Sequence, residues 1–147
     1  MATGNPLIDQ GSLNRLKASV KWTSFPGLNV TPSVLNAAGI ELALDGDITA
    51  FLRSYTGRVT SPEVFVPATL TINLLRTQSL SATYKQQVET QSTIGDCVVR
   101  VDSVVHPPYD LTNCGIQSVR PIVISGQDAG WSVVIGGTYL VNAGLWQ

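Results

Sequence analysis

Charged side chains are scarce in this chain. Lys, Arg, Asp and Glu make up 13% of its 147 residues, and the formal net charge is −1. That is about half the charged share of an ordinary globular protein. The sequence has no basic run, so a charged patch for binding nucleic acid is not expected. The surface must therefore be neutral and polar, or be covered by partners.

Long apolar segments are also missing. No stretch approaches the ~20 residues that a membrane-spanning helix needs. The N-terminal segment MATGNPLIDQGSLNRL has no charged head and no apolar centre, so we expect no export signal. These features predict a protein without a membrane partner.

Residues suited to catalysis or metal binding are few. The single histidine, His106, has no companions at metal-ligand spacing, and no G-x-S-x-G turn presents a serine nucleophile. We expect neither an enzyme nor a bound metal or cofactor. Cys97 and Cys114 are expected to be reduced, partly buried thiols, although a bridge across neighbouring strands stays open.

A strand–helix–strand unit at 63–102 organises the chain. Apolar and polar residues alternate over 64–76, which predicts a strand with one apolar and one hydrated face. Over 79–90, Leu80, Tyr84 and Val88 recur at helical spacing, which predicts a helix that covers the sheet with one stripe.

Further strands are predicted on both sides of this unit. Together with the strand at 64–76 they give six strands and one helix, in a single domain spanning 1–147. We expect a mainly β fold, a mostly antiparallel β-sandwich or barrel with one flanking α-helix. The other predicted strands span 15–23, 39–44, 96–105, 116–125 and 131–141.

Two segments lie outside this core pattern. Residues 1–14, rich in Gly, Asn and Ser, indicate an extended N-terminal arm. Residues 45–62 lack clean periodicity and indicate a long loop, which either packs on its own core or reaches a neighbouring subunit. Pro67 within the long strand predicts an edge position or a bulge, since proline donates no ladder hydrogen bond.

The order of these features resembles the tail tube proteins of bacteriophages with contractile tails (myovirus-type). The similarity covers nearly the whole chain and is most specific in the strand-to-helix passage. The segments that carry it are LNVTPSVLNAAGIELALDGD, SYTGRVTSP, TINLLRTQSLSATYKQQVET, IGDCVVRVDS, YDLTNCGIQSV and GTYLVNAGLWQ.

The resemblance implies a structural virion protein. Hexameric rings of such subunits stack into a hollow tube, assembled in the host bacterial cytoplasm, that conducts DNA during ejection and templates the contractile sheath. The implied partners are further copies of the chain, the sheath protein, the tape measure protein and passing DNA in the lumen, and the baseplate and tail terminator at the ends.

The resemblance also assigns three candidate surfaces. The loop 45–62 would contact the next ring, and the N-terminal arm 1–14 would reinforce that contact. One face of the long strand would line the lumen. The side of the helix away from its apolar stripe would face the sheath. The ring-contact candidates are Asp45, Asp47, Phe51, Arg53, Tyr55 and Arg58; the lumen candidates are Glu41, Thr69, Thr71 and Asn73; the sheath candidates are Lys85, Gln86 and Glu89.

Two other functions remain open at this point. One is a baseplate tube-initiator or tail-completion protein of the same fold. The other is a carbohydrate-binding β-sandwich that stacks sugar rings on Trp22, Trp131 and Trp146. Core or interface packing is the alternative role for these tryptophans, because Trp22 and Trp131 share strand parity with apolar residues.

Overall fold

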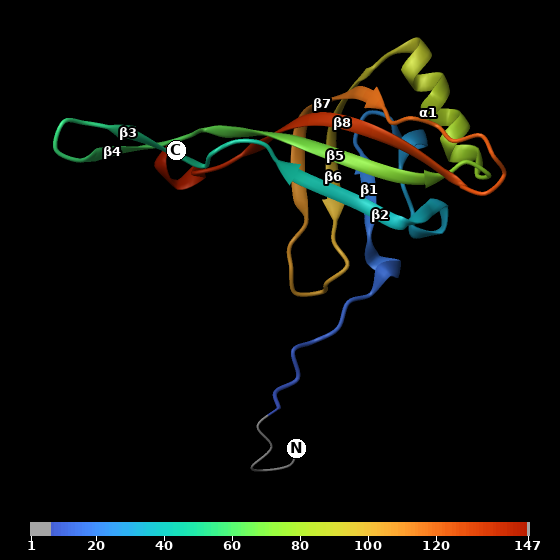
Figure 1. Ribbon diagram of the computed structural model, residues 1–147, viewed down its shortest axis with the longest axis horizontal. Coiled ribbons are helices and arrows are strands. Elements are labelled where there is room, and N and C mark those ends of the chain that lie inside the picture. The colour runs from blue at the N-terminus through green and yellow to red at the C-terminus, as the bar shows by residue number, and fades with distance from the viewer. Residues whose placement is uncertain (1–6, 147) are drawn as a thin grey trace.

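One six-stranded antiparallel sheet dominates the computed structural model, which describes residues 7–146 (Figure 1). The sheet curls into a half-barrel with a single α-helix on its flank, so the predicted mainly β class with one helix is confirmed. Its order is β1-β6-β7-β8-β5-β2. The strands are β1 (Ser19–Trp22), β2 (Leu35–Leu44), β5 (Phe65–Leu75), β6 (Thr93–Arg100), β7 (Tyr109–Val119) and β8 (Gly130–Leu140).

The inner face of the curled sheet carries the core. On β5, residues of even number are buried while the side chains between them point to the other face, as the alternation predicts. β8 contributes Trp131, Val133 and Ile135 to the same core. Short 3-10 helices connect the elements near the sheet ends: η1 (Arg15–Lys17), η2 (Pro26–Leu28), η3 (Pro32–Val34) and η4 (Ala143–Leu145).

The helix α1 (Ser79–Thr90) has the predicted bounds. Leu80 and Tyr84 face the core, but Val88 is 37% exposed, because the stripe runs off the sheet towards the C-terminal end of the helix. The buried residues of the helix are Tyr84 and, instead of Val88, Ser81. The Ser81 hydroxyl donates to the Gln78 carbonyl at 2.8 Å. The Ser81 N–H donates to the same carbonyl at 3.3 Å, so both bonds hold Ser81 to the residue that precedes the helix.

Pro67 lies in an interior strand, but the ladder between this strand and β2 stops next to the proline, where an edge position or a bulge was predicted. β5 has β2 on one side and β8 on the other. The Pro67 carbonyl accepts from the Asp45 N–H at 2.7 Å, which places the proline nitrogen on the β2 side as well. The ladder ends at the preceding Leu44–Ala68 pair, because the proline nitrogen has no hydrogen to donate back to the Asp45 carbonyl.

The predicted loop at 45–62 is instead a β-hairpin. Its strands β3 (Thr49–Arg53) and β4 (Arg58–Pro62) pair antiparallel and form a separate two-stranded sheet. The turn is closed by the Ser54 N–H, which donates to the Gly57 carbonyl at 2.8 Å. Period-2 alternation is absent here because neither face is buried against the body, so sequence periodicity could not reveal the strands.

Several strand boundaries also differ from the predictions. The segment 15–23 divides into η1 and β1, because the Asn14 side chain accepts from the Leu16 N–H and caps a 3-10 turn. The strand predicted at 39–44 begins earlier, at Leu35, with a register break before Ile40. The strand predicted at 96–105 lies at β6, and the one at 116–125 lies at β7. The left-handed Asn113 (φ 51°) interrupts the pattern of β7 in the sequence, since it lies at a bulge.

Candidate interaction surfaces

The β3–β4 hairpin projects well beyond the body of the molecule (Figure 1). Its base is held where the Asn142 amide donates to the carbonyls of Ile48 (3.2 Å) and Glu63 (2.8 Å). An isolated two-stranded hairpin is marginally stable in water. This one is therefore anchored at its base, while its outer part has no packing partner among residues 7–146.

Both faces of the hairpin expose apolar side chains. Phe51 lies on one face, and the cross-strand pair Leu52–Val59 lies on the other. Tyr55 in the turn is fully exposed. Arg58 lies over the Phe51 ring, with its guanidinium carbon 4.3 Å from the ring centroid. A two-sided apolar surface on a projecting hairpin is suited to insertion between other protein surfaces.

Charge on the hairpin is separated along its length. Arg53 and Arg58 face each other across the strands near the turn, and the hairpin strands contain no carboxylate. Asp45 and Asp47 lie exposed at the base. Among residues 7–146 the one salt bridge joins Lys85 and Glu89, so neither arginine has an ionic partner within the described chain. Every predicted ring-contact residue is thus exposed and lies on this hairpin or at its base.

The four predicted lumen residues share one polar face of the sheet. Glu41 on β2 pairs with Thr71 on β5, and Thr69 and Asn73 flank Thr71 on the same face. Thr69 donates to a carboxylate oxygen of Asp45, while the Asn73 amide donates to the Gly39 carbonyl at 3.0 Å. Thr71 itself is 4% exposed, so within one subunit it supports this face rather than contacting solvent.

The same polar face continues onto β8. The Ser132 hydroxyl donates to the Asn73 side-chain oxygen at 2.6 Å, and Gly136 lies opposite Thr69. No Lys or Arg occurs in β2, β5 or β8, so this face is neutral apart from Glu41 and the adjacent Asp45.

The outward side of α1 carries the three predicted sheath residues. Lys85, Gln86 and Glu89 are all exposed, and the Lys85 ammonium lies 2.6 Å from a Glu89 carboxylate oxygen. Such an i, i+4 pair contributes only a few tenths of a kcal/mol when solvated. These side chains are therefore available to a partner at little cost.

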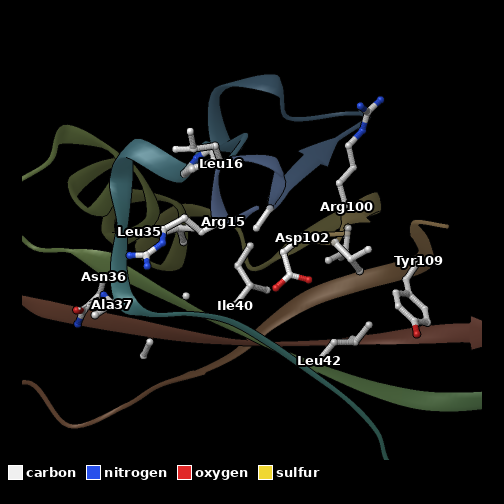
Figure 2. A pocket seen from close by; sticks show the side chains of 16 residues that line it. Arg15, Leu16, Leu35, Asn36, Ala37, Ile40, Leu42, Arg100, Asp102 and Tyr109 are labelled. Atoms are coloured by element: carbon white, nitrogen blue, oxygen red, sulfur yellow. Dashed lines mark hydrogen bonds between the residues drawn. The ribbon is translucent and has the colours of Figure 1, made fainter. Parts of the chain in front are cut away.

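A groove of about 740 Å³, called the seam groove below, lies between β2, the residues that precede β1 and the C-terminal end of β6. Figure 2 shows Leu35, Ile40 and Leu42 of β2 on one wall, with Asp102 and Tyr109 across from them. β2 pairs only with β5, so its outer edge has no strand partner among the described residues. The groove and the free edge could not be found from the sequence, because strand order is not readable from it.

The buried polar groups serve the core. The Trp22 indole N–H donates to the Tyr84 hydroxyl at 3.0 Å, and that hydroxyl donates to the Leu28 carbonyl at 2.7 Å. Burial raises the pKa of Tyr84 well above its ordinary value. This chain of hydrogen bonds fastens the helix to β1 and η2.

The two cysteines are free thiols in neighbouring strands. Cys97 and Cys114 are both buried, with their sulfurs 3.9 Å apart. The hydrogen bond to Cys114, followed by burial, raises the pKa of Cys97. Such a thiol is a poor nucleophile, since the thiolate is the reactive form.

The residues considered for other chemistry are spread apart. His106 lies in an exposed turn, where its Nε2 contacts the Tyr109 hydroxyl at 2.7 Å. Across residues 7–146, no group of three or more His, Cys, Asp or Glu side chains could hold a metal ion. Within the same residues, no helix has the length and hydropathy to cross a membrane. Trp22 and Trp131 are buried, which leaves Trp146 as the tryptophan with an accessible face for a sugar.

Comparison of the sequence with models of known protein families and with curated proteins gives no match.

Proposed function

We propose that this chain is a structural subunit of a bacteriophage tail tube, in which hexameric rings stack into a hollow tube. The observation that carries the proposal is the projecting β3–β4 hairpin, whose two faces expose Phe51 and the Leu52–Val59 pair. A monomeric protein rarely keeps apolar surface on so slender an element. A neighbouring ring that receives the hairpin would bury both faces.

The free edge of β2 supports lateral assembly within each ring. An unpaired edge strand is a template for pairing with another chain, and closure of a ring removes every such edge. Glu41, Thr69 and Asn73 lie on the polar face of β2 and β5. If these sheets join side by side, that face lines the lumen.

The composition of this polar face supports the conduction of DNA. Binding to phosphates depends on Lys and Arg, and the strands β2, β5 and β8 contain neither. DNA would pass such a lining without being retained. The exposed Lys85, Gln86 and Glu89 on α1 would then face outwards, towards the sheath.

The hairpin provides a direct test of ring stacking. Tyr55→Asp and Phe51→Asp place a charge where the next ring would pack, and both positions are exposed in the single subunit. We expect both variants to fold and to lose tubes in negative-stain electron micrographs. Ile124→Asp, in the exposed β7–β8 connection, is the matched control and should still form tubes. Tubes of normal length from the hairpin variants would exclude the hairpin as the stacking contact.

A further inference from the structure

The seam groove has an apolar wall that another protein segment can cover. The apolar side chains of Leu35, Ile40 and Leu42 line its β2 wall (Figure 2). Among residues 7–146, no segment closes the open side of this groove. Since apolar surface at the edge of a core is stabilised by removal from water, a segment that fills the groove would be held by hydrophobic contact.

The described part of the N-terminal arm, residues 7–14, begins at this groove but does not fill it. Arg15 and Leu16, at the root of the arm, form part of the groove lining. The Asn14 N–H donates to the Asp102 carbonyl at 2.8 Å, and the Asn14 side chain accepts from the Leu16 N–H. Fixed by these two bonds, the arm leaves the body and extends away from it (Figure 1).

The arm carries apolar side chains that its own subunit leaves exposed. Ile8 is 77% exposed and Leu13 is 73% exposed, in a segment otherwise made of small and polar residues. The described part of the arm, residues 7–14, spans about 26 Å when extended. The groove is lined by β2 over residues 35–42. This part of the arm is therefore long enough to follow that stretch of β2, and its apolar side chains suit the apolar wall.

Charge favours the arm over the β3–β4 hairpin as the segment that occupies the seam groove. The groove is lined by Arg15 and Arg100 against one carboxylate, Asp102. The hairpin end carries Arg53 and Arg58, so it would bring like charges together. The single charge of the arm is Asp9, which complements the groove.

We infer that the arm of one copy lies in the seam groove of a second copy, with Ile8 and Leu13 against the apolar wall formed by β2. The inference rests on the proposed assembly and names the partner of this surface: residues 7–14 of another subunit. Exchange of an identical segment between subunits links them without new structure, because each copy supplies both the arm and the groove.

Cysteine cross-linking between different copies tests the inference. Ile8→Cys is mixed with Ala38→Cys, which lies exposed on the groove wall, and one of the two variants carries an affinity tag. After mild oxidation with a small disulfide, each cross-link consumes two thiols, and the added disulfide is reduced to its own two thiols. We expect a mixed, reducible dimer at least about tenfold more abundant than in the matched control mixture of Ile8→Cys with Ile124→Cys. The native Cys97 and Cys114 are buried and present in every sample.

Each outcome separates the inference from the proposed function. Tubes in the micrographs with mixed dimers no more abundant than in the control would overturn the placement of the arm and leave the tube intact. A bond within one chain in the Ile8→Cys, Ala38→Cys double variant, without mixed dimers, would place the arm in its own groove and also overturn the inference. Absence of rings or tubes from the unmodified protein would instead contradict the proposed function.

Discussion

At the residue scale, Gly137 shows how closely β8 approaches β7. A Cβ at this position would lie 2.7 Å from the Cys114 sulfur, which is closer than nonbonded atoms approach. Only glycine therefore fits at position 137, because the Cys114 thiol occupies the space that a Cβ would take. Adjacent glycines within a strand, as at 136 and 137, are typical of a close approach of this kind.

Gly137→Ala should destabilise the fold by about 1–3 kcal/mol, because the sheet must shift to admit the methyl group. Gly27→Ala is the matched control, since a Cβ there meets nothing within 4 Å. Urea denaturation of both variants measures the difference. Cys114→Ala should recover part of the loss when combined with Gly137→Ala, and strictly additive effects would contradict the assigned clash.

The hydroxyl of Tyr84 is the other residue-scale determinant of the core. Tyr84→Phe removes the acceptor of the Trp22 indole N–H and the donor to the Leu28 carbonyl, leaving both buried groups without their partner. We expect a loss of about 1–3 kcal/mol in the free energy of unfolding. A change below the error of denaturant titration would show that water replaces the hydroxyl.

Alkaline pH provides an independent test of Tyr84. Burial raises its pKa in the folded state above the value of an unfolded tyrosine, near 10. The folded state then binds its proton more tightly, so the stability due to this group is complete below about pH 10 and is lost as the pH rises further. The unfolding free energy of the native chain should therefore fall more steeply above pH 10 than that of Tyr84→Phe. Parallel curves would contradict the assignment.

At the element scale, the helix and the long strand could be predicted and the hairpin could not. α1 and β5 each bury one face, and this burial imposes a period of 3.6 or 2 on the sequence. β3 and β4 bury neither face against the rest of residues 7–146, so no core contact imposes an alternation on their sequence. The bulge at Asn113 similarly broke the pattern of β7, and the strand was placed too late.

The candidate surfaces were partly predictable for the same reason. The face shared by Thr69, Thr71 and Asn73 follows from the parity of β5 and is confirmed as one polar face. The free edge of β2 and the seam groove depend on which strands pair, and pairing over long sequence separations is not encoded locally. The resemblance implied that the N-terminal arm contacts the next ring, but the sequence could not indicate which surface Ile8 and Leu13 would meet.

Substitutions on the hairpin should separate assembly from stability. Since Tyr55 is fully exposed, Tyr55→Asp is expected to change the unfolding free energy of the dissociated subunit by less than about 0.5 kcal/mol. The same change should abolish sedimentation of tubes. Comparison of urea denaturation with analytical ultracentrifugation checks both. A large loss of stability would mean that the hairpin packs on its own subunit.

At the scale of the whole molecule, the proposed assembly would account for the low charge, the projecting hairpin and the open sheet edge together. The proposed lumen can be tested through its charge. Glu41 is exposed on the polar face of β2, and Glu41→Lys changes each subunit by two charges in the direction that favours phosphate binding. Tubes of this variant should retain short DNA at low salt and release it as salt increases. Unchanged DNA binding by intact tubes would place Glu41 outside the lumen.

The most direct test of the tube is negative-stain electron microscopy of the purified, unmodified protein over a range of concentrations. The proposed function predicts six-fold rings and hollow tubes that lengthen as the concentration rises. A strictly monomeric, monodisperse protein at the highest concentration would contradict it.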